Sequence, residues 1–162
     1  MNTLLAQYNS WMNARVYSVC EQLSDEDRKL DRGAFFNSIH GTLNHLIVGD
    51  KVWLARFQGT TFTVPSLDFE LYANFNDLHK ARLALDKEIE TWAAALTAEV
   101  LSTSCEYTSV VDNKKRKYDM SVAVAHFFNH QTHHRGQITT LLSQCGLDCG
   151  LTDLIGLPAI EP

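Results

Sequence analysis

Apolar residues recur at intervals of three and four along four stretches of the chain, which is the spacing of one face of an α-helix. The pattern predicts long helices over residues 3–23, 37–57, 74–98 and 121–145. In the first of them the apolar face consists of Leu4, Leu5, Tyr8, Trp11, Met12, Val16, Val19 and Leu23. Ser24 followed by Asp27 is a variant of the capping box, so we expect a short helical turn after this first helix.

The hydrophobic period changes between the third and fourth predicted helices. Residues 105–111 alternate and are rich in β-branched side chains, residues 112–114 have turn composition, and residues 116–120 form a returning strand. The sequence therefore predicts an all-α fold, a four-helix bundle of antiparallel type, with a small β-hairpin inserted before the last helix. The link between the third and fourth helices is long enough to permit other connectivities. A length of 162 residues with 45% apolar content predicts a single domain over residues 1–162.

The last predicted helix contains a stripe of histidines spaced four residues apart. With His130 at zero on a helical wheel of about 100° per residue, His126 lies at about −40° and His134 at about +40°. Leu141 lies at about +20°, so the stripe faces the core of the bundle. Each unsatisfied polar atom of a buried imidazole costs roughly 1–3 kcal/mol, and a divalent metal ion is one group that satisfies several of them at once.

A further histidine lies on the second predicted helix among small side chains. Gly41 and Gly49 are near neighbours of His45 on the helical wheel. Each glycine costs a helix about 1 kcal/mol relative to alanine, so two of them indicate close approach or free space beside this histidine.

We predict that His45, His130 and His134 form a three-histidine metal site with an open position for water or substrate. The i, i+4 spacing fits His126 with His130 equally well, so spacing leaves the choice of pair open. If His126 supplied a fourth protein ligand, no coordination position would remain for water or substrate, and a structural metal site would be indicated instead. The competing interpretation is that all these histidines are hydrogen-bonded core residues. His40 and His79 are expected to be structural, and His126 and His133 are expected to lie beside the ligands or at the rim of the site.

Charge and cysteine content narrow the class of protein. Lys and Arg number 14 against 19 Asp and Glu, and the one dense basic run, residues 114–117, lies in a predicted turn. Nucleic-acid binding needs a basic face, so we expect no nucleic-acid partner. We also expect no membrane association, since no apolar run reaches about 18–20 residues.

The four cysteines lack a paired framework and the N-terminus lacks a signal-peptide pattern, which predicts a cytoplasmic protein.

Three sequence segments resemble the DinB/YfiT-like metalloenzyme family, the damage-inducible helical bundles rather than the DNA polymerase of the same name. They are Gly41-Thr-Leu-Asn-His45-Leu, Asp50-Lys-Val-Trp-Leu-Ala-Arg-Phe57 and Asn129-His-Gln-Thr-His-His-Arg-Gly-Gln137. The resemblance covers nearly the whole chain. It implies a four-helix bundle, often dimeric, that binds one divalent metal ion, commonly nickel or zinc, through His45, His130 and His134.

Characterised relatives in that family are transferases or isomerases that use low-molecular-weight thiols such as mycothiol or bacillithiol. The resemblance therefore implies a metal-dependent, thiol-dependent transferase acting on a small electrophilic substrate. Two alternatives remain open: a non-catalytic metal- or ligand-binding stress protein, and a metal-dependent hydrolase. Asp and Glu are absent from residues 121–147, which argues against a carboxylate general base for hydrolysis.

Three polar residues near the histidines are expected to serve packing or interface contacts rather than catalysis. Asp50 lies about 140° from His45 on the wheel, so we expect it to form a helix-packing salt bridge or to lie in an interface. We expect Arg135 and Gln137 to make bundle or dimer contacts. A homodimer is implied by the resemblance and is suggested by the aromatic side chains Tyr8, Trp11 and Trp53.

Overall fold

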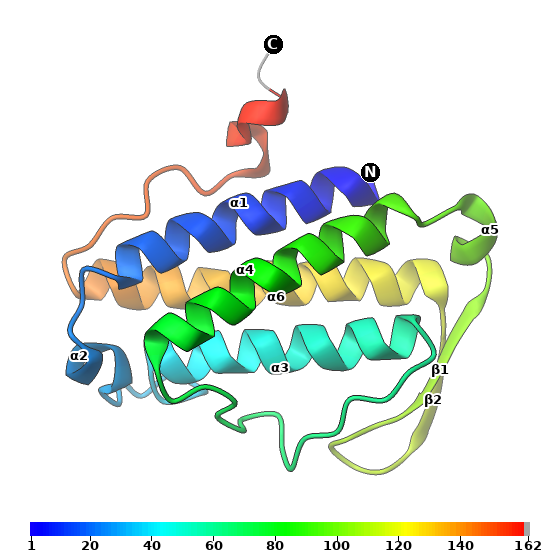
Figure 1. The fold of residues 1–162 in the computed structure, drawn as a ribbon, viewed down its shortest axis with the longest axis horizontal. Helices are drawn as coiled ribbons and strands as arrows, with labels where there is room; N and C mark the ends of the chain where they lie inside the picture. Colours follow the sequence, from blue (N-terminus) through cyan, green and yellow to red (C-terminus); the bar gives the residue numbers. More distant parts are fainter. Residues whose placement is uncertain (161–162) are drawn as a thin grey trace.

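Four long helices form the body of the protein in the computed structural model, which describes residues 1–160 (Figure 1). They are α1 (Asn2–Cys20), α3 (Ile39–Phe57), α4 (Phe75–Ala94) and α6 (Met120–Gln144). The shorter elements are α2 (Asp25–Lys29), α5 (Ala98–Leu101), the antiparallel strands β1 (Ser104–Thr108) and β2 (Lys115–Asp119), and the 3-10 turns η1 (Leu154–Gly156) and η2 (Pro158–Ile160). The all-α bundle with a hairpin before the last helix is confirmed.

The connectivity of the bundle differs from the simple antiparallel arrangement that we expected. Helix α1 packs against α4 and α6, and α3 packs against the same two helices. In Figure 1, α3 and α4 run in the same direction, while α1 and α6 run in the opposite direction. Residues 58–74 form a crossover that returns along the length of α3 before α4 begins. Bundles with long crossovers are a known variant, and here the crossover covers one side of α3.

Side-chain caps explain where two of the helices begin. The Ser38 hydroxyl accepts a hydrogen bond from the backbone N–H of Gly41 at 3.0 Å, which starts α3. The Thr97 hydroxyl accepts from the backbone N–H of Val100 at 3.2 Å and starts α5. The predicted helix over residues 74–98 is therefore wrong at its end: α4 stops at Ala94, and Thr97 opens a separate helical turn.

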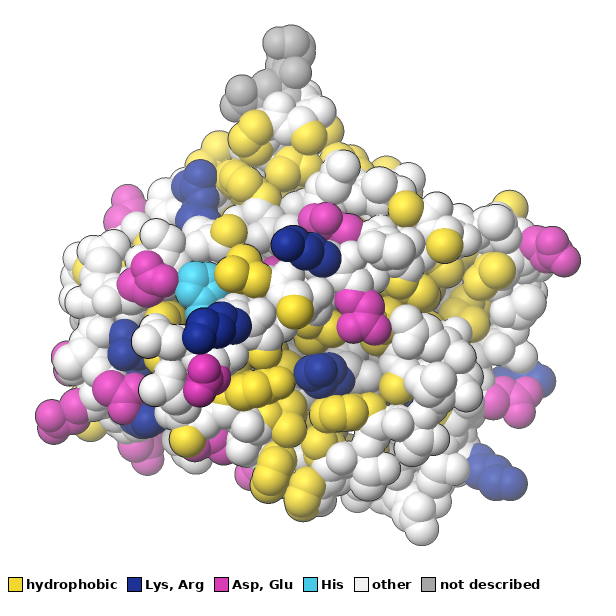
Figure 2. All heavy atoms as spheres, viewed as in Figure 1, with side chains coloured by type: hydrophobic (Ala, Val, Ile, Leu, Met, Phe, Trp, Pro, Cys, Tyr) yellow, Lys and Arg dark blue, Asp and Glu magenta, His cyan; other side chains and the backbone are white. Residues whose placement is uncertain are grey.

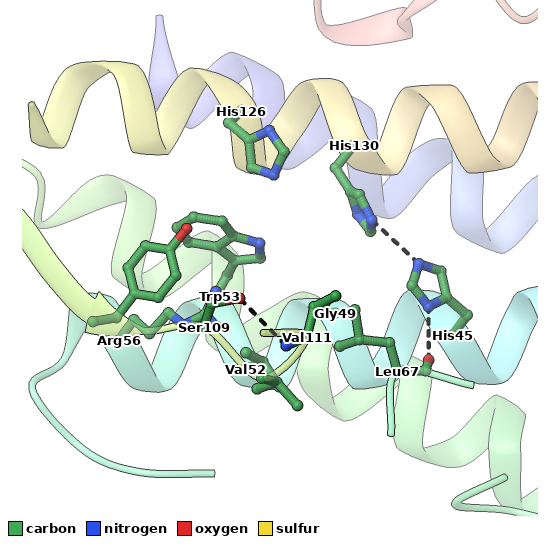
Figure 3. A pocket seen from close by; sticks show the side chains of 12 residues that line it. His45, Gly49, Val52, Trp53, Arg56, Leu67, Ser109, Val111, His126 and His130 are labelled. Carbon is green, nitrogen blue, oxygen red and sulfur yellow. Dashed lines mark hydrogen bonds between the residues drawn. The ribbon is translucent and has the colours of Figure 1, made fainter. Parts of the chain in front are cut away.

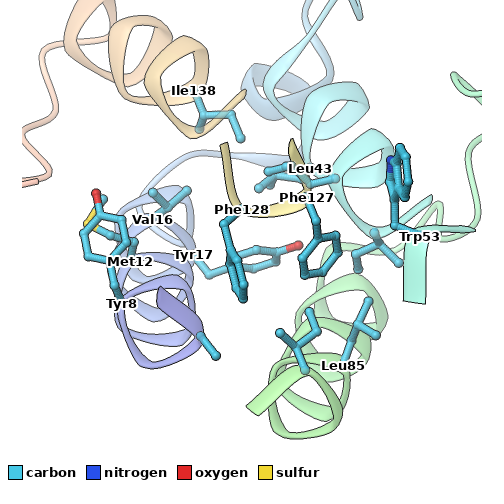
Figure 4. Close-up of a cluster of buried hydrophobic side chains, with 14 of the residues drawn as sticks. Tyr8, Met12, Val16, Tyr17, Leu43, Trp53, Leu85, Phe127, Phe128 and Ile138 are labelled. Atoms are coloured by element: carbon cyan, nitrogen blue, oxygen red, sulfur yellow. The ribbon is translucent and has the colours of Figure 1, made fainter. Parts of the chain in front are cut away.

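Apolar side chains from all four long helices meet along the bundle axis (Figure 4). Burying one large apolar side chain contributes about 1.5–3 kcal/mol, so this cluster is the main source of stability. Its buried members include Met12, Val16, Tyr17, Leu43, Leu85, Phe127, Phe128 and Ile138.

The aromatic residues that suggested a dimer interface serve contacts within the chain. Tyr8 is buried and its hydroxyl donates to the backbone carbonyl of Thr152 at 2.6 Å. Trp53 is also buried. Trp11 contacts Arg15, whose guanidinium carbon lies 4.6 Å from the centre of the indole ring. Tyr8 and Trp53 are thus covered within the chain, whereas Trp11 stays partly exposed. The homodimer stays a prediction.

A buried ion-pair network fixes α3, α4 and α6 relative to one another. Arg82 on α4 donates to the carboxylate of Asp50 on α3 at 2.6 Å and pairs with Asp86 at 2.9 Å. The Gln131 amide on α6 donates to the second Asp50 oxygen at 2.9 Å. The expected helix-packing salt bridge of Asp50 is present.

The same network extends to α1 through amide side chains. Asn9 and Asn13 both donate to Asp86, at 3.1 and 2.9 Å. The buried Arg135 guanidinium of α6 donates to the side-chain oxygens of both asparagines. The bundle contact expected for Arg135 is thus confirmed, and two arginines balance two aspartates inside the bundle.

The surface shows mixed charges on the face drawn in Figure 2, where Lys and Arg side chains lie beside Asp and Glu side chains. None of the helices within residues 1–160 combines the length and apolarity needed to cross a membrane.

Candidate metal centre

The three predicted histidines meet at one point between α3 and α6. The Nε2 atom of His45 lies 3.2 Å from Nε2 of His130 and 3.2 Å from Nε2 of His134. The Nε2 atoms of His130 and His134 are 3.1 Å apart. The structure thus brings together the predicted three residues and leaves His126 out of the cluster.

Hydrogen bonds on the far side of two rings determine which nitrogen holds the proton. His45 Nδ1 lies 2.8 Å from the backbone carbonyl oxygen of Leu67, which only accepts, so Nδ1 donates. His134 Nδ1 lies 2.7 Å from the Gln137 side-chain oxygen and donates likewise. In a neutral imidazole the other nitrogen is then an acceptor. His45 and His134 therefore direct lone pairs at each other, an arrangement that a bound cation stabilises.

The spacing of the three nitrogens agrees with tetrahedral metal coordination. Zinc–nitrogen bonds of about 2.0–2.1 Å at tetrahedral angles separate ligand nitrogens by about 3.3–3.4 Å. The observed separations of 3.1–3.2 Å are close to that value. Metal-bound histidines usually donate their second N–H to a carbonyl or another acceptor, as two of these rings do.

Burial keeps these rings in the form that binds metal. Removal from water lowers the pKa of His45 to about 4 and that of His130 to about 3. Burial also lowers the pKa of His134. All three imidazoles are consequently neutral at pH 7, the protonation state required of a ligand.

Gln137 has a different role from the bundle or dimer contact that we expected. Its oxygen accepts from His134 Nδ1 and so fixes the orientation of that ring. Gln137 follows His134 by three residues on α6, and this i, i+3 spacing was the sequence signal for the contact.

We expect the substitution Gln137→Leu to weaken metal binding by about 10–100-fold, because loss of an outer-shell acceptor frees the ligand ring. Competition with a chromogenic chelator measures this affinity. Gln144→Leu on the same helix, where the side chain is exposed, is the matched control. Equal affinities in the two variants would contradict the orienting role.

Two contacts of His45 could not be predicted from the spacing of residues along the sequence. The ring of Phe36, from the segment before α3, stacks on the imidazole with centroids 3.7 Å apart and an interplanar angle of 16°. The Leu67 carbonyl comes from the crossover, 22 residues along the chain. Both segments lack regular structure, so only the folded chain places them against this histidine.

The two glycines of α3 serve packing rather than an open position. A Cβ added to Gly49 would lie 3.0 Å from Cε1 of His130, so the glycine makes room for that ring. A Cβ on Gly41 would collide with the backbone carbonyl of Phe36. Of the two predicted alternatives, close approach holds at both glycines, because neighbouring protein groups fill the space beside them.

The other histidines have protein contacts outside the cluster. His40 Nε2 lies 2.8 Å from the Tyr72 carbonyl oxygen, and His79 lies 3.1 Å from the Glu21 carboxylate. The exposed ring of His126 is 4.9 Å from that of Trp53, between centroids. The expected structural roles of His40 and His79 and the rim position of His126 agree with these contacts.

A cleft of about 180 Å³ leads to the histidine cluster between α3, α6 and the hairpin (Figure 3). In Figure 3, His45 lies at one end and Trp53 and Arg56 at the other, with His126 and His130 facing them from α6. The lining contains no Asp or Glu within residues 1–160. It consists of His45, Gly49, Val52, Trp53, Arg56, Leu67, Tyr107, Ser109, Val110, Val111, His126 and His130.

Comparison with known proteins agrees with this architecture. The chain is 27% identical over 164 residues to Protein DinB of Bacillus subtilis, covering 92% of this chain and 88% of that protein. The crystal structure of a DinB-like protein from Bacillus cereus superposes with a TM-score of 0.64 at 19% identity, covering 86% and 89% of the two chains, and shows the same fold. The DinB family model matches residues 1–161, so this chain belongs to the DinB family.

Proposed function

We propose that the protein binds one divalent metal ion through His45, His130 and His134 and uses it in a thiol-dependent transfer to a small electrophile. The observation that supports the metal site is the convergence of three Nε2 atoms within 3.2 Å, two of them without a proton. Nickel and zinc are the metals that the family resemblance implies, and imidazole ligands suit both.

An open coordination position favours a catalytic or ligand-binding site over a structural one. Structural zinc sites normally have four protein ligands. The cluster contains three ligating side chains within residues 1–160, and the cleft borders both His45 and His130. A ligand in the cleft would reach the remaining position from that side.

The transfer reaction needs a sulfur nucleophile and a sheltered electrophile. A bound divalent ion would deprotonate a coordinating thiol and hold it as a thiolate. In the overall reaction an S–C bond forms, the S–H bond and the bond to the leaving group break, the proton goes to solvent, and the leaving group departs with its electron pair. The buried Trp53 and the aliphatic side chains of Val52 and Leu67 would exclude water from the reacting groups.

Metal-dependent hydrolysis has less support at this site. Activation of water usually needs a general base beside the metal, most often a carboxylate or a histidine. No carboxylate lines the described part of the cleft, and the exposed His126 lies nearer Trp53 than the cluster, with a ring-centroid distance of 5.8 Å to His130.

Cobalt substitution tests the thiol-dependent function directly. The cobalt(II) protein is titrated with a simple thiol such as 2-mercaptoethanol and followed by absorption. We expect a sulfur-to-cobalt charge-transfer band that saturates at one thiol per chain and is lost in His134→Ala. A cobalt spectrum that no thiol changes would contradict the transferase function and leave a non-catalytic metal-binding protein.

We also propose a homodimer, on the family resemblance alone. Sedimentation at micromolar concentration is expected to give twice the chain mass of 18.3 kDa. A single species at the chain mass would contradict this proposal without affecting the metal site.

A further inference from the structure

Arg56 differs from every other arginine in the described chain. Within residues 1–160 no carboxylate pairs with its guanidinium and no polar atom accepts a hydrogen bond from it, although the side chain is half-buried. Each of the other six contacts an oxygen atom of the protein: Arg15, Arg28, Arg32, Arg82, Arg116 and Arg135. A desolvated cation without a partner is costly, so an anionic group from outside the chain would stabilise it.

Two aromatic rings hold the guanidinium in place. Its central carbon lies 3.8 Å from the ring centre of Tyr107 on β1 and 4.7 Å from that of Trp53 on α3. Such stacking uses the flat face of the group and fixes its orientation. The N–H edges remain for a ligand, and a carboxylate is the anion that matches this fork with two parallel hydrogen bonds.

Arg56 shares a face of α3 with the metal-site histidine. It follows His45 by 11 residues, which is about 20° on the helical wheel and about 16 Å along the axis. Gly49 and Val52 lie between them, and all four line the same cleft (Figure 3). A ligand joining the two ends is therefore elongated.

The walls between these ends are mostly apolar, with Ser109 and His126 as the polar exceptions near Arg56, and the volume is small. Val52, Leu67 and Val111 line the cleft, with the indole of Trp53 beside Arg56. The volume of about 180 Å³ is well below the roughly 300–1,000 Å³ of a drug-sized ligand site. A single cation with aromatic walls suits one carboxylate on a short apolar chain.

We propose that Arg56 is a specificity-determining residue that binds the carboxylate of a small elongated ligand, a thiol or an electrophile, whose other end reaches the three-histidine site. This inference rests on the proposed metal site for the far end of the ligand. The carboxylate contact itself involves only Arg56 and its aromatic supports.

A pair of thiols that differ only at the distal group tests the proposal. The cobalt(II) protein is titrated with 6-mercaptohexanoate and with 6-mercaptohexan-1-ol, and the charge-transfer band gives both affinities. We expect the carboxylate to bind at least about tenfold more tightly, as for hydrogen bonds to a charged group. Arg56→Gln is expected to abolish this preference while leaving the affinity for the alcohol unchanged.

A matched variant tests whether the preference for the carboxylate depends on the arginine in the cleft or on the loss of any arginine that stacks on an indole. Arg15→Gln also removes an arginine stacked on an indole, but on α1 and outside the cleft, so it should keep the preference. Equal affinities for the two thiols in the native protein, or an unchanged preference in Arg56→Gln, would overturn the proposal.

A metal-free measurement distinguishes this proposal from the metal site. Calorimetry with hexanoate and hexan-1-ol needs no cobalt, and the native protein should prefer hexanoate while Arg56→Gln should not. Failure to take up cobalt, with this preference intact, would contradict only the proposed metal function. Cobalt binding without any preference for a carboxylate would overturn only the role of Arg56.

Discussion

The substitution Arg82→Met is expected to lower the free energy of unfolding by about 3–5 kcal/mol. The guanidinium is 2% exposed and neutralises both Asp50 and Asp86, at 2.6 and 2.9 Å. Removing it leaves two buried carboxylates without their shared cation, and breaking a buried pair by deleting one partner has an effect of this size. Urea unfolding measures the change.

Two further variants identify the cause of the Arg82 effect. Lys117→Met removes one member of an exposed ion pair, with Glu106 at 2.6 Å, and should leave the urea midpoint unchanged. Adding Asp50→Asn to Arg82→Met should restore part of the lost stability, because it removes one orphaned charge. A midpoint for Arg82→Met equal to that of the native protein would contradict the importance of the network.

Zinc is expected to stabilise the folded protein by about 4 kcal/mol when its free concentration is about 1,000 times the dissociation constant. The three histidines meet only in the folded chain, because His45 lies on α3 and the other two lie on α6. Metal bound to the native state therefore adds its binding free energy to stability. Chemical denaturation with and without zinc measures the increment.

Two histidine variants test whether this stabilisation arises from zinc bound at the three-histidine cluster. His134→Ala should lose nearly all of the increment, since two ligands hold a metal less firmly than three. His126→Ala should keep it, because that ring lies outside the cluster. An equal increment in both variants would indicate that zinc binds elsewhere on the chain.

Local patterns predicted the helices well and the histidine ligands only in part. The apolar spacing gave α1, α3, α4 and α6 to within a few residues at most ends, and the Ser24 cap of α2 is present. The histidine stripe on α6 follows from i, i+4 geometry, which depends only on the helix. The choice of His130 with His134 came from the family resemblance rather than from spacing, and these two rings meet His45 in the structure.

The contacts that complete the site depend on the tertiary fold. Phe36 and the Leu67 carbonyl reach His45 from irregular segments, for which the sequence has no periodicity to read. The direction of α4 depends on how the crossover 58–74 folds back, and helical patterns do not specify it. The helical wheel identified Gly49 as a position of close approach or free space, and only the fold shows that the ring of His130 approaches it.

The metal content of protein purified without an affinity tag, measured by elemental mass spectrometry beside the His45→Ala variant, tests the central claim most directly. We predict about one divalent metal ion per chain in the native protein and almost none in the variant, with the helical content of both unchanged. No metal in the native protein, and none taken up from added zinc or nickel, would contradict the three-histidine site, as would full metal content in His45→Ala.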